Sequence, residues 1–310
     1  MLVAEDCIPC ILKMAIGGLR SSKLDANLMR KALMGIMEKI MSTDDVWEIT
    51  SAELVERALL FIKNFTGITD PFLETKQKTN ATAMALMAHF RNYIKSSRDP
   101  LFTSTKLSII ANVIDNMVLD GNSQYHFDKI ISDVESLPLD YGTYEKFLDK
   151  LSTSKSIVII GDNSAESLFD MLLIETIKKY FPVEASYIVR HEPTLNDVTL
   201  DDALNFGLNQ VANVITNGII GPLPGTILRR CSAEARNLFW NSDMVIVKGG
   251  GSFETLSEEK IAMPHVFFLL MCKCKVHMSF FNKPIGEGII WRRDSYELRE
   301  HQKQVQRNSL

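Results

Sequence analysis

The second half of the chain alternates short apolar runs with amphipathic segments, and this alternation limits the folds available to it. The apolar runs cover residues 156–160, 184–189, 211–215, 244–247 and 288–291. The segments with helical spacing between them cover residues 167–180, 200–208 and 234–240. Strands that alternate with helices form βαβ units, whose parallel sheet carries helices on both faces. We therefore predict a three-layer α/β/α architecture with a mainly parallel sheet.

The first half of the chain has a different texture. From residue 11 to about residue 150, apolar residues recur at helical spacing, as in residues 28–37 and 83–87. The last residues of the chain are polar. We therefore predict an all-helical N-terminal domain at 1–150, an α/β domain at 151–293 and a polar C-terminal tail at 294–310.

Charge and composition narrow the class of partner. A net charge of -4 over 310 residues provides no field for binding nucleic acid or anionic lipid. No segment has the ~20 continuous apolar residues that cross a bilayer. Five cysteines are too few for a disulfide scaffold in a chain of this length. We expect a cytoplasmic protein that binds a small ligand, with neither nucleic acid nor a membrane as partner; the sequence does not indicate its oligomeric state.

Polar side chains follow the predicted strands. In an open parallel sheet, ligands bind beyond the carboxyl ends of the strands, so these residues are expected to lie close together. They are Asp162, Asn163 and Glu166 after the first apolar run, Asp197 after the second, Asn217 after the third, and Lys248, Gly249 and Glu254 after the fourth.

The acids in this set favour a metal ion. Asp162 and Asp197 are hard oxygen donors and Asn163 adds a carbonyl oxygen, a set that suits Mg²⁺, Mn²⁺ or a similar divalent cation. A bound cation would reverse the local charge, so an anionic substrate could lie beside Asp162. The alternative is that Asp162 and Asn163 only form a turn, where both residue types are common. Neighbouring Asp201 and Asp202 are better explained as acids at a helix start, because Thr199 and Asp202 have capping-box spacing.

Lys248 precedes three glycines. Its ammonium and the backbone N–H groups of the following turn would form an oxyanion site. The lysine comes before the glycines, and no Lys-Ser or Lys-Thr closes the motif, so this is not a Walker A loop. Three glycines also form tight left-handed turns, and this second interpretation stays open.

Together, these segments resemble the damage-control phosphatase family, also known as domain of unknown function 89. The resemblance covers residues 7–291, nearly the whole chain. The α/β half carries it in residues 161–166, 193–203, 214–218 and 247–256. The helical half carries it in Asp70, Pro71, Phe72 and Lys76, and in residues 111–115.

The resemblance implies a metal-dependent phosphatase that hydrolyses small phosphorylated metabolites such as sugar phosphates, with Mn, Ni, Co or Mg as cofactor. It implies metal ligands at Asp162, Asn163 and Asp197, with Asp162 and Lys248 catalytic and Lys248 in contact with phosphate. It places Asn163, Glu166, Asn217, Gly249 and Glu254 at the substrate. Whether an aspartate or a metal-bound water attacks phosphorus stays open, as does whether Asn112 and Asp115 line the pocket or form a buried polar turn.

Two departures from the family pattern occur. The glycine loop often reads Lys-Gly-Gln-Gly-Asn in the family, whereas this chain has Gly250 and Ser252 in place of the two amides. Lys275 stands where proline is usual.

Two alternatives to the enzyme are a non-catalytic protein that binds phosphorylated metabolites and a cysteine-based metal or redox protein.

The cysteines raise a separate question. Cys7 and Cys10 have the C-x-x-C spacing that brings two thiols to one metal or to each other. The resemblance is to a subfamily that pairs this motif with a later Lys-Cys, here Lys273 and Cys274. Cys7, Cys10 and Cys274 are thus candidates for a second metal or redox site, or else small buried residues. We expect Cys231 and Cys272 to be part of the core.

Overall fold

A computed structural model describes residues 1–111 and 123–293, and its centre is one six-stranded sheet. The strand order is β3-β2-β1-β4-β5-β6; the first five of these strands are parallel and β6 runs antiparallel to β5. This confirms the predicted α/β class. The strands are β1 Ser156–Ile160, β2 Glu184–Val189, β3 Asn213–Thr216, β4 Met244–Lys248, β5 Met263–Met271 and β6 Gly288–Arg293.

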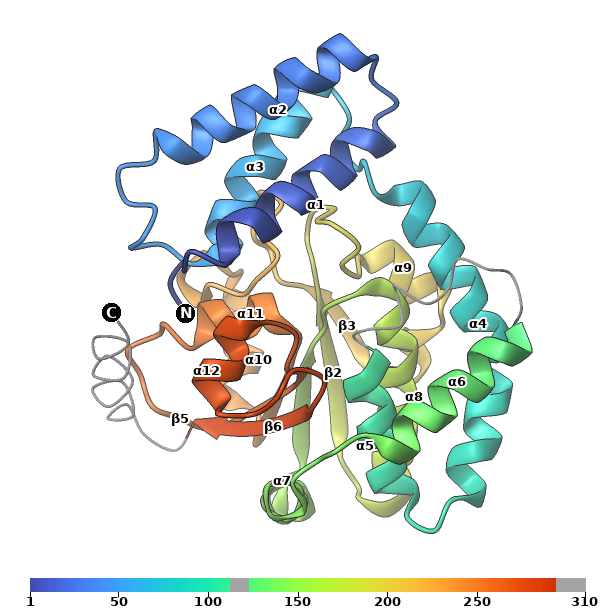
Figure 1. Ribbon diagram of the computed structural model, residues 1–310. Coiled ribbons are helices and arrows are strands. Elements are labelled where there is room, and N and C mark those ends of the chain that lie inside the picture. Colours follow the sequence, from blue (N-terminus) through green and yellow to red (C-terminus); the bar gives the residue numbers. More distant parts are fainter. Residues whose placement is uncertain (112–122, 294–310) are drawn as a thin grey trace.

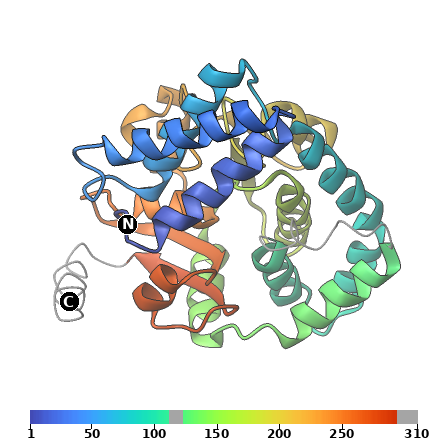
Figure 2. The same cartoon turned by 45° about the horizontal axis from the view of Figure 1, so that its top comes forward.

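Helices cover both faces of the sheet, and strand residues alternate between them. Ile157 and Ile159 of β1 pack into the core under one face, whereas Val158 and Ile160 pack into the core under the other. The first face is covered by α4 Leu73–Ser96, α5 Pro100–Ile110, α6 Ser123–Ser136, α7 Tyr141–Thr153, α8 Ser164–Tyr180 and α9 Leu200–Asn205. The second is covered by α10 Ala233–Asn241, α11 Gly250–Leu256 and α12 Lys275–Phe281. Figures 1 and 2 both show α4, α5 and α6 on the same side as α8.

Three N-terminal helices form a separate apolar cluster. They are α1 Cys7–Ser21, α2 Ala26–Met41 and α3 Ser51–Thr66. The side chain of Asp25 caps α2, and Thr50 with Glu53 forms a capping box at the start of α3. Figure 1 shows these helices beyond the end of the sheet at which the parallel strands terminate, and α3 contacts α11 there.

The remaining N-terminal helices do not form a core of their own. Phe90 of α4 and Phe147 of α7 belong to the same buried cluster as Ile159 of β1 and Phe267 of β5. The change of texture near residue 150 therefore separates helix from strand in the sequence, while the hydrophobic core runs across it. The boundary itself remains a prediction, and the predicted tail at 294–310 lies outside the described residues, as do Asn112 and Asp115.

The sequence prediction missed one strand and misplaced another. No strand was expected at 263–271, where β5 lies; Cys272 follows this strand and Cys274 is the N-cap of α12. A continuous apolar run has no period that distinguishes a buried strand from a buried helix. The third strand was expected at 211–215 and lies at 213–216. The capping box of Thr199 and Asp202 is confirmed.

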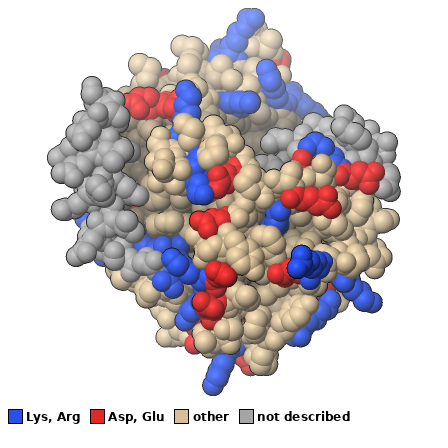
Figure 3. Space-filling model, turned by 60° about the horizontal axis from the view of Figure 1, so that its bottom comes forward, with Lys and Arg blue, Asp and Glu red and all other residues tan. Residues whose placement is uncertain are grey.

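One face of the surface carries side chains of both charges (Figure 3). Figure 3 shows basic and acidic side chains interspersed over the face at the bottom of Figure 1. Among the helices of the described residues, none combines the length and the apolar character needed to cross a membrane.

Candidate active site

The strand order reverses at β1, because β2 lies on one side of it and β4 on the other. Ligands of open α/β sheets bind at such a switch point, beyond the carboxyl ends of the strands. Asp162 follows β1 and Gly249 follows β4, so both lie at this point. Gly249 has φ +76, and a Cβ there would lie 2.0 Å from Oδ2 of Asp162. Only glycine therefore leaves room for the carboxylate.

The backbone brings the second acid to the same place. Asn163 and Asp197 form an isolated antiparallel bridge between the β1–α8 turn and the β2–α9 loop. The Val198 N–H donates to the Asp162 carbonyl at 2.8 Å, and the Ser164 N–H donates to the Asn196 carbonyl at 2.8 Å. The three predicted metal ligands, Asp162, Asn163 and Asp197, are thus neighbours through main-chain pairing.

The loop that carries Asp197 contains an unusual backbone conformation. Leu195 has φ +47, a region that non-glycine residues seldom adopt. Its side chain packs against the apolar cluster of α1, α2 and α3. The strain, about 1–3 kcal/mol for such a residue, is thus accompanied by an apolar anchor two residues before Asp197.

Arg190 also belongs to the site, and our sequence prediction omitted it. Its Nε donates to Oδ2 of Asp197 at 2.6 Å, and its Nη2 lies 3.6 Å from Oδ1 of Asp162. It directly follows the second apolar run, but no role was assigned to it there; the structure shows that it is buried, whereas the adjacent His191 is exposed. The available signal was its place directly after a buried strand.

The buried acids are charged only at a cost. Burial, with the neighbouring charges of Asp197 and Glu166, raises the pKa of Asp162 to about 8. Burial also raises the pKa of Asp197, although Arg190 acts in the opposite direction. A divalent cation would favour the charged form of both acids.

The donor set fits a hard cation that retains water ligands. It consists of two carboxylates and one carboxamide oxygen, all of which are oxygen donors of the kind Mg²⁺ and Mn²⁺ prefer. Within residues 1–111 and 123–293, no group of three or more His, Cys, Asp or Glu side chains is arranged to hold a metal ion. The third protein ligand here would be the amide of Asn163.

The Lys248 side chain lies in the protein interior, where Glu166 connects it to the candidate ligand Asn163. It is fully buried, with Nζ 2.7 Å from the Ser108 carbonyl, 3.1 Å from Oδ1 of Asp170 and in an ion pair with Glu166. Burial lowers the pKa of Lys248, but Asp170 and Glu166 more than offset it, so the pKa is raised and the ammonium stays charged. An ammonium has three N–H donors, so a direct phosphate contact requires the exchange of one of these partners.

Two hydroxyl groups complete the buried network around Lys248. The Ser108 hydroxyl donates to Oδ1 of Asp170 at 2.6 Å, and the Tyr187 hydroxyl donates to Oδ2 at 2.7 Å. Glu166 links this network to the candidate ligands, because it accepts from Nδ2 of Asn163 at 3.2 Å. Asp170, Tyr187 and Ser108 lie within regular elements, where no local sequence signal marks them.

Asn217 and Glu254 hold the surrounding segments. Oδ1 of Asn217 accepts from the N–H groups of His191 at 3.1 Å and Ile219 at 3.0 Å. Glu254 accepts from the Ser51 hydroxyl and lies 3.1 Å from Nε2 of His277. Burial raises the pKa of Glu254, but these two partners more than offset it and leave the pKa lowered.

Of the three candidate cysteines, Cys10 is exposed and Cys7 and Cys274 are half-buried. Burial raises the pKa of Cys7, Cys10 and Cys274, and the charge of Glu254 adds to this effect in each case. Cys7 is also affected by Cys10 and Cys274, so the three thiols lie within electrostatic range of one another. Cys231 and Cys272 are buried in the core, as predicted.

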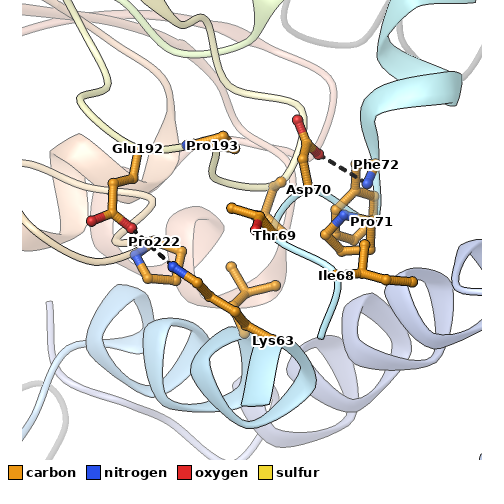
Figure 4. A pocket seen from close by; sticks show the side chains of 11 residues that line it. Lys63, Ile68, Thr69, Asp70, Pro71, Phe72, Glu192, Pro193 and Pro222 are labelled. Atoms are coloured by element: carbon orange, nitrogen blue, oxygen red, sulfur yellow. Dashed lines mark hydrogen bonds and ion pairs between the residues drawn. The ribbon is translucent and has the colours of Figure 1, made fainter. Parts of the chain in front are cut away.

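The helical half closes the site from a further side. Nδ2 of Asn80 donates to the Ser164 hydroxyl at 2.9 Å, and Nζ of Lys76 lies 3.0 Å from Oδ2 of Asp202. Nearby, Figure 4 shows a small cavity where the loop at 68–72 meets the loop at 192–195, bridged by Lys63 and Glu192 at 3.5 Å. Its volume of about 10 Å³ is room for no more than one water molecule. It is therefore not a substrate pocket.

Comparison with known proteins identifies the family of the chain. Residues 3–289 match the model of the damage-control phosphatase ARMT1-like domain. The chain belongs to this family. Its enzymatic class is accordingly that of a phosphatase.

Three relatives match this chain, two of them over nearly its whole length. A damage-control phosphatase from Pyrococcus horikoshii is 27% identical over 300 residues, which cover 96% of this chain and 100% of the relative. An uncharacterized protein from Methanocaldococcus jannaschii is 28% identical over 302 residues, covering 94% and 95%. A damage-control phosphatase from Archaeoglobus fulgidus is 28% identical over 228 residues, covering 73% and 76%.

A solved structure supports the ARMT1-like fold. The crystal structure of a domain-of-unknown-function-89 protein from Pyrococcus horikoshii superposes with a TM-score of 0.84 at 24% identity. The match covers 95% of this chain and 100% of that chain. At this identity the likeness establishes the fold.

Proposed function

We propose that this phosphatase is metal-dependent and hydrolyses phosphate monoesters of small metabolites such as sugar phosphates. The observation that carries the proposal is the convergence of Asp162, Asn163 and Asp197 at the switch point of the sheet. The two relatives named damage-control phosphatases support the substrate class. Mn²⁺, Ni²⁺, Co²⁺ and Mg²⁺ are the candidate cofactors, and a cytoplasmic location belongs to the same proposal.

We propose a different role for each group of residues in the site. A cation held by Asp162, Asn163 and Asp197 would stabilise negative charge on the phosphoryl oxygens. The Gly249 turn lies directly against the Asp162 carboxylate, so we propose that it borders the phosphate. Lys248 and Glu166 would set the charge and orientation of the ligands from behind, through the contact of Glu166 with Asn163. Asn217 and Glu254 would hold the segments around the substrate in place through their hydrogen bonds.

A substrate and metal panel tests the proposal. Purified protein is assayed for phosphate release from several sugar phosphates with each of the four metals and with a chelator. We expect metal-stimulated release that Asp162→Asn and Asp197→Asn each reduce by at least about 10²-fold. Asp201→Asn, an exposed acid at the start of α9, is the matched control and should retain activity.

The same panel separates the enzyme from a non-catalytic binder. Thermal stabilisation by a sugar phosphate without any turnover, in every metal, would contradict the proposed hydrolysis. The separate proposal of a metal or redox site at Cys7, Cys10 and Cys274 is tested by metal analysis and thiol titration of the wild type and of Cys7→Ser. Equal metal content and thiol reactivity at the other two cysteines would contradict it.

A further inference from the structure

Arg190 connects four segments of the chain that meet at the candidate site. It follows β2, and its guanidinium reaches Asp197 in the β2–α9 loop, the Gly225 carbonyl, the Ser252 hydroxyl of α11 and, at longer range, Asp162 after β1. Its side chain is 3% exposed. Its guanidinium presents N–H donors in a rigid planar fork that matches the geometry of a carboxylate.

The guanidinium is held in place by groups that carry no charge. Nη1 donates to the Gly225 carbonyl at 2.7 Å, and Nη2 donates to the Ser252 hydroxyl at 3.3 Å. Ser252 is itself 3.1 Å from the Thr226 hydroxyl. The guanidinium is therefore held by neutral partners as well as by Asp197, so its position does not depend on the acid alone.

Arg190 treats the two acids differently. Its Nε bonds to Oδ2 of Asp197 at 2.6 Å, whereas the closest approach to Asp162 is 3.6 Å, an ion pair without hydrogen-bond geometry. A charge-assisted bond of the first kind is short, directional and about twice as strong as a neutral one. It fixes the rotation of the Asp197 carboxylate.

We propose that Arg190 is a positioning residue, which orients the carboxylate of Asp197 for the cation. This inference rests on the proposed metal-dependent function. Arg190 would act through Asp197, because each of its three nitrogens already donates to a protein partner and the shortest of these bonds is to Asp197. Groups that orient metal ligands from behind typically contribute 10–100-fold to metal affinity.

The direction of the effect distinguishes positioning from simple charge. A fixed positive charge repels a divalent cation, so a guanidinium that only neutralised the acids would compete with the metal. Its removal would then tighten metal binding. If Arg190 orients Asp197, its removal weakens metal binding instead.

The test measures metal binding separately from turnover. Thermal unfolding is followed across titrations of Mn²⁺ and Mg²⁺ for the wild type, Arg190→Gln, Arg190→Lys and the control Arg230→Gln, which removes a different ion pair, that with Glu56. We expect Arg190→Gln to require about 10–100-fold more metal for the half-maximal shift. Arg190→Lys should be intermediate, because it keeps the charge and loses the fork, and Arg230→Gln should match the wild type.

Kinetics supply the second readout. At saturating metal, Arg190→Lys should recover kcat with little change in the KM of the phosphate ester. A raised KM with unchanged metal dependence would overturn the inference in favour of a direct substrate contact. Unchanged or tighter metal binding in Arg190→Gln would overturn it as well.

A further variant guards against loss of folding. If neither variant of Arg190 gives a cooperative unfolding transition, Ser252→Ala removes one neutral anchor of the guanidinium and should weaken metal binding in the same direction, by a smaller factor. Unchanged metal binding in Ser252→Ala would then overturn the inference. A wild type that no metal stabilises would overturn the proposed cation site itself, which is a different outcome from a metal-responsive wild type with an unaffected Arg190→Gln.

Discussion

The carboxylate of Asp162 fills the space that a side chain at Gly249 would occupy. A Cβ at residue 249 would approach Cγ and Oδ2 of Asp162 to 2.0 Å, and the backbone there has φ +76. The turn after β1, which carries Asp162, therefore restricts the turn after β4. Only glycine at position 249 leaves room for the Asp162 carboxylate.

Gly249→Ala should displace Asp162 and remove activity. We expect a loss of kcat/KM of at least about 10²-fold, since small misplacements of reacting groups have effects of this size. Gly286→Ala is the matched control, because Gly286 also has positive φ, at +95, but no atom lies within 4 Å of its Cβ position. Both variants should lose about 1–3 kcal/mol of stability to backbone strain, measured by urea unfolding, and equal activities would contradict the steric argument.

The metal-free protein should become less stable as the pH rises from about 4 to 8. The pKa of Asp162 in the folded protein, about 8, lies above its ordinary value of 3.8. The folded state thus holds a proton that the unfolded chain releases, and this contribution is complete below the unfolded pKa and is lost as pH approaches 8. Asp162→Asn should flatten this dependence by up to a few kcal/mol. The free energy of unfolding is measured by urea denaturation at pH 5 and pH 8 in the presence of a chelator. An equal change in this free energy between the two pH values for the wild type and Asp162→Asn would refute the assignment.

Lys248→Met should destabilise the protein as well as inactivate it. Removing the ammonium leaves Glu166 and Asp170 buried without their cation, which typically costs about 3–5 kcal/mol. Asp170→Asn in the same chain removes one of the two uncompensated charges, so the double variant should recover part of the lost stability. A double-mutant cycle by chemical denaturation tests this coupling. Additive effects would show that Lys248 and Asp170 do not act as a pair.

Leu195→Ala should loosen the Asp197 loop. The variant keeps the strained backbone and removes the half-buried anchor, so we expect a loss of about 1–2 kcal/mol. The half-maximal metal concentration should rise, because Asp197 lies two residues further along. Leu204→Ala, an exposed leucine on α9, serves as the control. A Leu195→Ala variant with wild-type stability and metal response would show that the anchor plays no part.

The sequence was sufficient for the architecture and for the residues that end strands. Asp162, Asn163, Asp197 and Gly249 each follow an apolar run, and parallel topology brings such positions together. What it lacked was information on burial by distant segments. Arg190 is covered by Gly225 and Ser252, and Lys248 by Ser108 and Asp170, and none of these is a sequence neighbour.

The strand β5 was missed for a different reason. The sheet is covered by helices on both faces, so residues of Met263–Met271 on either face are apolar. The sequence of this strand therefore shows no alternation of apolar and polar residues. Cys272 directly follows this strand and Cys274 is the N-cap of α12, so the two cysteines belong to different elements.

The core that runs from α4 and α7 into the sheet has a consequence for how this chain can be divided. Phe90 and Phe147 cover Phe169 and Phe267 directly. A fragment that starts at residue 151 would expose this apolar face to water. A fragment that stops at residue 150 would keep the cluster of α1, α2 and α3 but would leave Phe90 and Phe147 without their partners. We therefore expect exchange of segments between related chains to preserve the core only when α4 to α7 move together with the sheet.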